Sequence, residues 1–221
     1  MDHVEHAQNR SGWRLLIAGT GGQGALTTAR LLCDRFVELG HQVVSGQLHG
    51  MAQRGGAVQS SVIIDGGISP VIPSGRADYV LGYEPVEAVR ALLFMSADTV
   101  VYMNTTPVIP FVLAQRALSK EGNAEYPAAE QLANAIRAVT AKLFTFDATR
   151  CATEAGSAKA LNMVMLGCLL GSKSLPCLAE DFWDGVAQRM PRALRAANAR
   201  AFWQGVELAA RFSAGKGAAC G

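Results

Sequence analysis

The stretch LLIAGTGGQGALTTARLL, residues 15–32, constrains the fold of this chain more than any other. It begins as a short apolar run, passes through several glycines, and resumes with apolar residues at helical spacing. This change of period predicts a buried strand that turns directly into a helix. Glycines suit such a junction because they allow a sharp turn and the close approach of an anion or another backbone. The turn residues that we expect to face a ligand or partner are Gly19, Gly21, Gly22, Gln23 and Gly24.

Two interpretations of this turn stay open at the level of the sequence. The spacing of Gly19, Gly21 and Gly24 satisfies G-x-G-x-x-G, and the unpaired N–H groups of the following helix would attract an anion. A dinucleotide site also needs an acid about 20 residues further on, at the end of the second strand, to bind the ribose. No acid stands there, and the first one after the second predicted strand is Asp65. The alternative is a tight turn used for packing or for contact with a partner.

The composition excludes several classes of protein. Half of the 221 residues are apolar and 17% are charged, which is typical of a folded domain and not of a disordered chain. The formal net charge of +2, without any basic run, gives no case for a nucleic-acid partner. The five cysteines include no C-x-x-C pair, so we expect no metal site, and their use fits a reducing cytoplasm.

The pattern along the chain predicts one domain with short ends. Residues 1–12 are polar and mixed in charge, unlike a signal peptide, and we expect them to form a flexible leader. Residues 13–212 form the predicted domain, and the glycine-rich residues 213–221 a flexible tail. The longest apolar run, residues 160–170, is too short to cross a bilayer, so we expect no membrane partner and a cytoplasmic location.

The alternation of strand and helix patterns predicts an α/β fold with a mostly parallel sheet and a helical C-terminal region. The β–α–β opening in particular predicts parallel strands joined by a right-handed crossover. Predicted strands span residues 13–18, 41–45, 59–64, 78–82, 99–103 and 142–147. Predicted helices span residues 22–39, 84–94, 127–139, 158–170, 179–189 and 192–212.

A second polar, glycine-rich segment, HGMAQRGGAV, follows the second predicted strand. We expect it to form a loop at the same sheet edge as the first turn, which is where open α/β sheets bind ligands. Its candidate site residues are His49, Gln53, Arg54, Gly55 and Gly56. The arginine could meet an anion or a partner carboxylate, or it could simply brace the loop, and a lone histidine is more often structural.

Two further polar residues complete the candidate site. Glu84 directly follows a predicted strand and begins a helix, so we expect it at the same edge. Asn162 stands near the start of an apolar helix, where a buried amide needs a partner, either a neighbouring loop or a ligand. No nucleophile stands beside a suitable base, no carboxylates are paired, and no lysine follows the glycine turn in P-loop fashion. We therefore predict no catalytic residue in this chain.

Four blocks in order resemble one family. These blocks are GTGGQGALTTARLL at 19–32, HGMAQRGGAVQSSV at 49–62, SPVIPSGRADYVLGYEPVEAVR at 69–90 and NMVMLGCLLG at 162–171. Together they resemble the gamma-type domain of the 2-oxoacid:ferredoxin oxidoreductases, and most closely the small (beta) subunits of the indolepyruvate type. The resemblance covers nearly all of residues 13–210.

The resemblance implies a Rossmann-like three-layer sandwich that binds no cofactor by itself. Thiamine diphosphate and iron–sulfur clusters would belong to a large (alpha) partner subunit, which decarboxylates an arylpyruvate such as indolepyruvate. Electrons would pass through the clusters to ferredoxin, and coenzyme A, the co-substrate, would take the acyl group. We expect the glycine-lined edge of this chain to help shape the approach of coenzyme A or substrate.

Two other hypotheses come from different classes of protein. A self-sufficient NAD(P)H-dependent reductase could use the same turn, with Arg54 binding a 2′-phosphate in place of the missing acid. A pure scaffold would bind no ligand at all.

Overall fold

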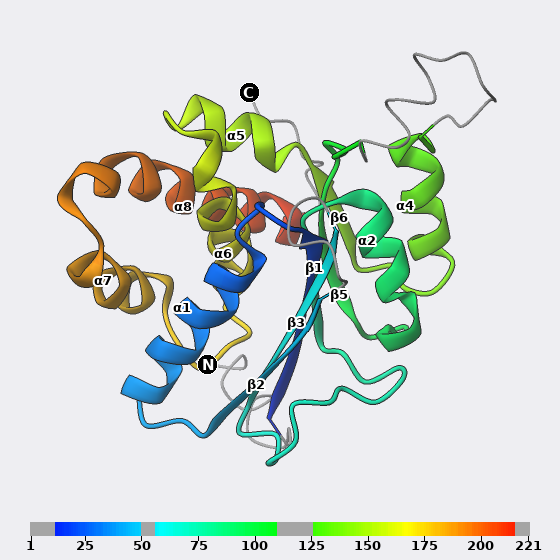
Figure 1. The fold of residues 1–221 in the computed structure, drawn as a ribbon, viewed down its shortest axis with the longest axis horizontal. Helices are drawn as coiled ribbons and strands as arrows, with labels where there is room; N and C mark the ends of the chain where they lie inside the picture. The colour runs from blue at the N-terminus through cyan, green and yellow to red at the C-terminus, as the bar shows by residue number, and fades with distance from the viewer. Residues whose placement is uncertain (1–11, 50–55, 110–125, 215–221) are drawn as a thin grey trace.

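The computed structural model describes residues 12–49, 56–109 and 126–214, shown in colour in Figure 1. Six strands form one sheet in the order β2-β3-β1-β4-β5-β6. Their bounds are β1 Trp13–Thr20, β2 Val43–His49, β3 Ala57–Ile64, β4 Tyr79–Gly82, β5 Val100–Asn104 and β6 Leu143–Phe146. Strands β1, β4, β5 and β6 are parallel neighbours, whereas β3 is antiparallel to both β1 and β2. The predicted α/β fold with a mostly parallel sheet is confirmed.

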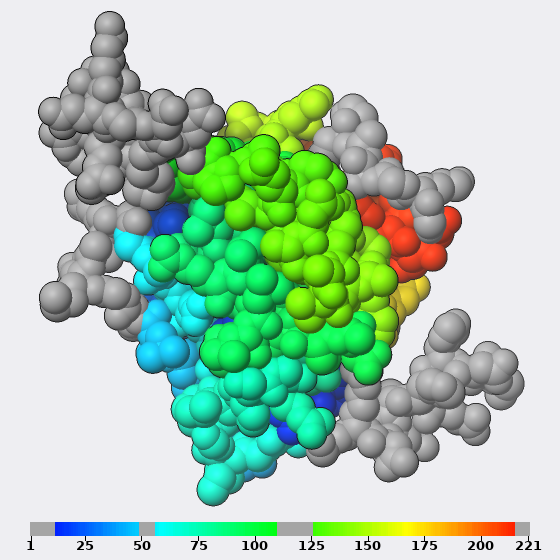
Figure 2. All heavy atoms as spheres, turned by 90° about the vertical axis from the view of Figure 1, so that its right-hand side faces the viewer, coloured from blue at the N-terminus to red at the C-terminus, as the bar shows by residue number. Residues whose placement is uncertain are grey.

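Helices cover both faces of this sheet (Figure 1). Their bounds are α1 Ala25–Glu38, α2 Pro85–Arg90, η2 Ala91–Phe94, α4 Ala129–Arg137, α5 Ala148–Glu154, η3 Ala158–Ala160, α6 Leu161–Gly171, α7 Ala179–Arg189 and α8 Arg192–Ser213. Helices α2 and α4 dominate the face seen in Figure 2. Helices α1, α6, α7 and α8 lie on the opposite side, so the molecule is a three-layer sandwich.

Strand β1 is the centre of both hydrophobic cores because its side chains alternate between the two faces. Leu15 and Ile17 are fully buried in the core beneath α1, α6 and α8. Leu16 and Ala18 point to the other side and join the core beneath α2 and α4. A strand buried on both faces reads as a continuous apolar run, which is how it stands out in the sequence.

The spatial order of the first three strands differs from the order that the sequence predicts. Strands β1 and β2 are parallel and joined through α1 as expected, but β3 lies between them. Strand β2 also extends to His49, four residues beyond the predicted end, and His49 is paired with Val58 of β3. The prediction that His49 belongs to a loop is therefore wrong. An edge strand with hydrogen bonds from one neighbour tolerates polar residues, and these hid the end of β2 in the sequence.

Two helix predictions also need correction. Helix α1 begins at Ala25 and not at residue 22, because Gly22 and Gly24 have left-handed φ angles of 105° and 89°. Helix α5 was not predicted, and Asp147, expected to end a strand, is its N-cap residue. The Asp147 carboxylate accepts a hydrogen bond from the Arg150 N–H at 2.8 Å, as helix starts prefer.

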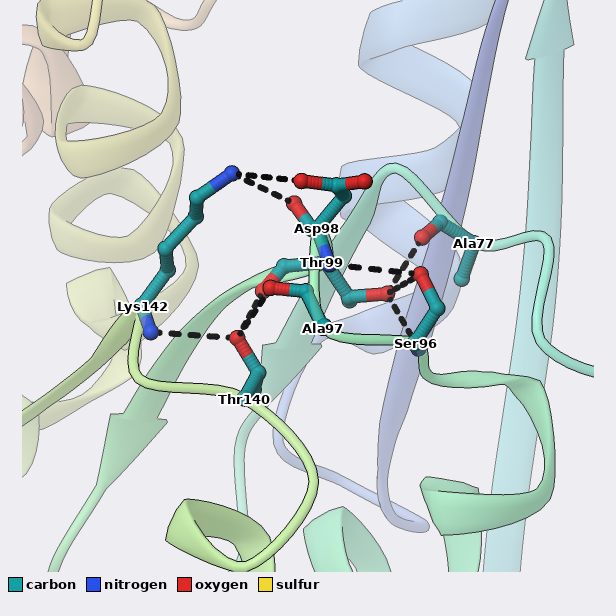
Figure 3. Close-up of polar contacts among 7 residues, drawn as sticks. All are labelled: Ala77, Ser96, Ala97, Asp98, Thr99, Thr140 and Lys142. Carbon is teal, nitrogen blue, oxygen red and sulfur yellow. Dashed lines mark hydrogen bonds and ion pairs between the residues drawn. The ribbon is translucent and has the colours of Figure 1, made fainter.

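Two buried threonines, Thr99 and Thr140, form hydrogen bonds at the edge of the sheet where β4, β5 and β6 begin (Figure 3). The Thr99 hydroxyl donates to the Ala77 carbonyl oxygen at 2.6 Å and accepts from the Ser96 N–H at 2.8 Å. The Thr140 hydroxyl donates to the Thr99 carbonyl oxygen at 2.8 Å. These bonds join the segments that lead into β4, β5 and β6. With its polar groups paired in this way, the amino edge serves to hold the strands in register.

Among the helices that the structure describes, none combines the length and the apolar character that a membrane span requires.

Candidate functional site

The glycine turn lies at the carboxyl edge of the sheet, between β1 and α1, and its glycines have different tasks. A Cβ atom at Gly19 would lie 2.8 Å from the Cβ atom of Tyr83, so this glycine permits close packing of β1 against the end of β4. A Cβ atom at Gly22 would meet no atom of the described residues within 4 Å. Gly24 is the N-cap residue of α1 and has no side chain to accept from the first helical turn.

The side chain of Gln23 closes the gap between β1 and β4. Its Oε1 atom accepts from the Thr20 N–H at 2.8 Å, and its Nε2 group donates to the Tyr83 carbonyl oxygen at 2.9 Å. The crossovers from β1 and β4 leave on opposite faces of the sheet here, which makes this the topological switch point where open α/β sheets bind ligands. Gln23 fills that position itself, so a ligand would have to lie above the turn and not between the strands.

Sequence reasoning missed a polar network beneath this edge. The phenol of the fully buried Tyr83 shares a 2.5 Å hydrogen bond with the Thr28 hydroxyl of α1, and burial raises the Tyr83 pKa. The Asn104 amide at the end of β5 donates to the Tyr83 carbonyl oxygen at 3.0 Å, and its Oδ1 atom accepts from the Ala148 N–H at 3.0 Å. The position of Asn104 directly after a strand was the available signal.

Glu84 lies at the edge as expected but its carboxylate is already engaged. It is 2% exposed, and its Oε2 atom accepts from the N–H groups of Val86 and Glu87 at 2.8 and 3.0 Å. Its Oε1 atom accepts from the phenol of Tyr126 and from the Val108 N–H at 3.4 Å. Glu84 thus caps α2 and joins three segments, which leaves it little capacity to bind a ligand.

The second glycine-rich segment meets the turn through Gly56. The Gly21 N–H donates to the Gly56 carbonyl oxygen at 2.9 Å. Gln53, Arg54 and Gly55 lie outside the described residues, as does the side chain of His49.

Asn162 lies against the glycine turn from the other side. It belongs to the first turn of α6 and is 7% exposed. Its Cβ, Cγ and Nδ2 atoms lie 3.2, 3.5 and 3.9 Å from the point where a Cβ atom of Gly24 would stand. Among the candidate residues described, the structure therefore brings together the glycine turn, Gly56 and Asn162, with Glu84 at the same edge.

No group of three or more His, Cys, Asp or Glu side chains suited to a metal ion occurs within the described part of the chain. Cys33, Cys168 and Cys177 are free thiols there, and burial raises the pKa of each. Within the described residues, therefore, neither a group of thiolates that could hold an iron–sulfur cluster nor a group of carboxylates that could hold the metal ion of a diphosphate is present.

Comparison with known proteins places this geometry in a family. Residues 14–208 match the model of the pyruvate ferredoxin/flavodoxin oxidoreductase family. The chain belongs to this family. Two relatives are named indolepyruvate oxidoreductase subunit IorB. The protein of Archaeoglobus fulgidus is 34% identical over 88% of this chain and 94% of its own, and that of Methanothermobacter thermautotrophicus is 33% identical over 90% and 98%. The resemblance to gamma-type subunits that the sequence suggested is confirmed.

Two solved structures have the same fold as this chain. The gamma subunit of a keto/oxoacid ferredoxin oxidoreductase from Geobacter sulfurreducens matches 90% of this chain and 98% of its own, with a TM-score of 0.61 and 22% identity. The pyruvate oxidoreductase subunit PORC from Thermotoga maritima matches 90% and 97%, with a TM-score of 0.64 and 20% identity. The match to the family and to the two relatives makes the chain an accessory subunit of the 2-oxoacid:ferredoxin oxidoreductase class.

Proposed function

We propose that this chain is the accessory subunit of a complex that oxidatively decarboxylates an arylpyruvate such as indolepyruvate. The product would be the arylacetyl thioester of coenzyme A, with the electrons passed to ferredoxin. The observation that carries the proposal is the match of about a third of the residues, over almost the whole length, to small subunits named for indolepyruvate oxidoreductase.

The proposal assigns the redox chemistry to a large partner subunit. Thiamine diphosphate would supply the carbanion-stabilising chemistry there and iron–sulfur clusters the electron path. The carboxylates that the structure describes at this edge, Glu84 and Asp147, cap helices, which fits a subunit that binds and orients. The contribution of this chain is then to bind and orient. Its glycine turn, Gly56 and Asn162 would form part of the wall past which coenzyme A or substrate reaches the partner's cofactor.

Coexpression with the large partner tests this assignment. We expect a stable complex with indolepyruvate- and coenzyme A-dependent reduction of ferredoxin, while the isolated chain shows no turnover. The control is a large subunit expressed alone under the same conditions. Turnover of arylpyruvate by the isolated chain, or full activity of the large subunit without it, would overturn the proposal.

The same preparation distinguishes the complex from an NAD(P)H-dependent reductase. Because β3 separates β1 from β2, the end of β2 does not adjoin the glycine turn as it must in a dinucleotide site. We therefore expect no saturable binding when the isolated chain is titrated with NADH or NADPH. The division of the chain into a domain at 13–212 with flexible ends stays a prediction, as does the cytoplasmic location.

A further inference from the structure

The outer edge of β2 carries backbone hydrogen-bonding groups that no described strand uses. Successive residues of an antiparallel ladder bond alternately to the strand on one side and toward the other side. The Asp65 N–H donates to the Gln42 carbonyl oxygen at 2.8 Å, and the register then assigns the even-numbered residues of β2 to the bonds with β3. The N–H and C=O groups of Val43, Ser45 and Gln47 therefore point away from β3, on the side where no other described strand lies.

Strand β2 lacks the features that usually prevent an edge strand from pairing. Edge strands are commonly short, or they carry charged residues or proline. The strand at the opposite edge, β6, follows this rule, since it has four residues and stands between Lys142 and Asp147. In contrast, β2 has seven residues, and its sequence VVSGQLH contains no proline, lysine, arginine or acid. An edge of this kind is suited to take up a further strand.

Exposed apolar side chains adjoin this edge on the face of the sheet opposite α1. Here β2 and β3 are covered by the β3–β4 connection, residues 65–78, which lies at the lower end of the face seen in Figure 2. A Cβ atom at Gly46 would lie 2.8 Å from the Pro70 Cβ atom, and the Ser61 hydroxyl donates to the Pro70 carbonyl oxygen at 2.6 Å. The three most exposed large apolar side chains of the described residues belong to β2 and this connection, and they are Leu48, Ile68 and Val71, at 70%, 86% and 70%. Grouped exposed apolar residues indicate a contact surface.

The place of this surface points to the large partner subunit as its occupant. The relatives of this chain are named as subunits, and permanent subunit contacts bury roughly 2,000 Å² or more, so the contact must extend beyond one strand edge. At its carboxyl end β2 lies beside the start of β3, next to Gly56, which accepts from the Gly21 N–H of the glycine turn. The β2 edge is thus continuous with the sheet edge at which this chain would guide a ligand to its partner.

We propose that the large partner subunit adds an extended segment to the edge of β2 and covers Leu48, Ile68 and Val71 with apolar side chains. The segment bonds to the outward N–H and C=O groups of β2, as in other cases of strand addition. Because β2 and the three apolar side chains are uncharged, the affinity should vary little with salt concentration. This inference rests on the proposed function for the existence of the large subunit, and it adds the surface to which that subunit binds.

Binding of the full chain to the large subunit tests the apolar part of this surface. We expect the dissociation constant to rise about tenfold or more in a double variant, Leu48→Lys with Ile68→Lys, since two charges would be buried against an apolar partner. Both side chains are exposed in the isolated chain, so the double variant should fold like the wild type, which urea denaturation checks. The matched control is Val139→Lys, an exposed position after α4, which packs on β6 at the opposite edge of the sheet (Figure 1).

A second variant tests the backbone bonds. Gln47→Pro removes one outward N–H group without loss of a bond to β3, and proline is tolerated in edge strands. It should weaken binding while Val139→Lys does not. If Gln47→Pro fails to fold, the double lysine variant still decides the outcome. Hydrogen exchange gives an independent measurement, since the amides of Val43, Ser45 and Gln47 should exchange more slowly once the large subunit is bound.

Two results would overturn the proposal. One is equal affinity of the double lysine variant and the Val139→Lys control for the large subunit. The other is slower exchange of the outward β2 amides as the concentration of the isolated chain increases, because the edge would then bind a second copy of this chain.

The outcome can be distinguished from that of the proposed function. An active wild-type complex that tolerates the edge variants would refute only the surface. A complex that forms through β2 but shows no turnover would support the surface and refute the function. A wild-type chain that binds no large subunit would refute both.

Discussion

At the scale of single residues, Glu84 shows how a predicted site residue acquires a different task. Its place after a strand and before Pro85 was evident in the sequence, and both features are confirmed by the structure. What the sequence could not show is that Tyr126, 42 positions away, would also donate to its carboxylate. Long-range polar partners depend on tertiary packing, so the same acid can serve as a ligand group in one fold and a cap in another.

Removal of this carboxylate should destabilise the chain. We expect Glu84→Ala to lower the free energy of unfolding by about 2 kcal/mol or more, since the α2 cap and the bonds to Val108 and Tyr126 are lost together. Urea denaturation measures the change. Glu154→Ala is the control because its ion pair with Arg150 is exposed to solvent and should contribute little to stability. Equal stability of the two variants would show that Glu84 is not a structural cap.

Glu87, one turn further along α2, should make stability depend on pH. Burial raises its pKa above the ordinary value of 4.5, an effect opposed by Arg90 and reinforced by Glu84, and its Oε2 atom is buried without a hydrogen bond. Because the folded pKa is the higher one, its favourable contribution is complete below pH 4.5 and is lost as pH rises through the folded pKa.

The variant Glu87→Gln cannot ionise and should escape this loss. Its stability relative to the wild type should therefore increase between about pH 4 and pH 7, as followed by denaturation at several pH values. A relative stability that stays constant, or that falls over this range, would contradict a raised pKa at Glu87.

At the scale of elements, the buried helix α6 was predictable but its packing was not. The apolar run at 160–170 indicated a helix that is apolar on nearly all sides and therefore buried, and each of these residues is buried. The sequence does not reveal that α8 crosses at Gly167, where a Cβ atom would lie 2.0 Å from the Phe202 carbonyl oxygen. Gly205 of α8 makes the reciprocal approach, 2.1 Å from the Val164 carbonyl oxygen. Paired glycines thus set the distance between the two helices.

We expect Gly167→Ala to destabilise the chain by about 3 kcal/mol or to prevent its folding, because backbone atoms of α8 would have to move. Thermal and chemical denaturation measure the loss. Gly185→Ala in α7 is the matched control, since the three atoms nearest to its new methyl group, at 2.7 to 2.9 Å, belong to the Arg35 side chain and not to a backbone, and alanine favours the helix. A Gly167→Ala variant as stable as this control would refute close packing at the crossing.

At the scale of the whole molecule, the order of the strands in the sheet could not be predicted from the sequence. The apolar run of β1 predicted a buried strand, but β2 and β3 have similar patterns, and either could have paired with β1. Insertion of β3 leaves β2 with one neighbour among the described strands. The same insertion brings the start of β3 to the glycine turn, where the Gly21 N–H bonds the Gly56 carbonyl oxygen, so the predicted proximity of the two glycine-rich segments depends on an unpredicted pairing.

Hydrogen exchange on the isolated chain and on its complex should map this arrangement. In the isolated chain, amides of β1 should exchange most slowly and those of β2 faster, because β1 is paired on both sides between two cores and β2 on one side. If the carboxyl edge faces the large partner, complex formation should slow exchange at residues 21–27 and leave Ser96–Thr99, at the opposite edge, unchanged. The exchange rates of the β1 amides serve as the internal reference, because a change in global stability would alter them in both samples. Slower exchange confined to the amides of the amino edge would place the partner at the opposite end of the sheet from the glycine turn. The turn could then not guide a ligand to the partner.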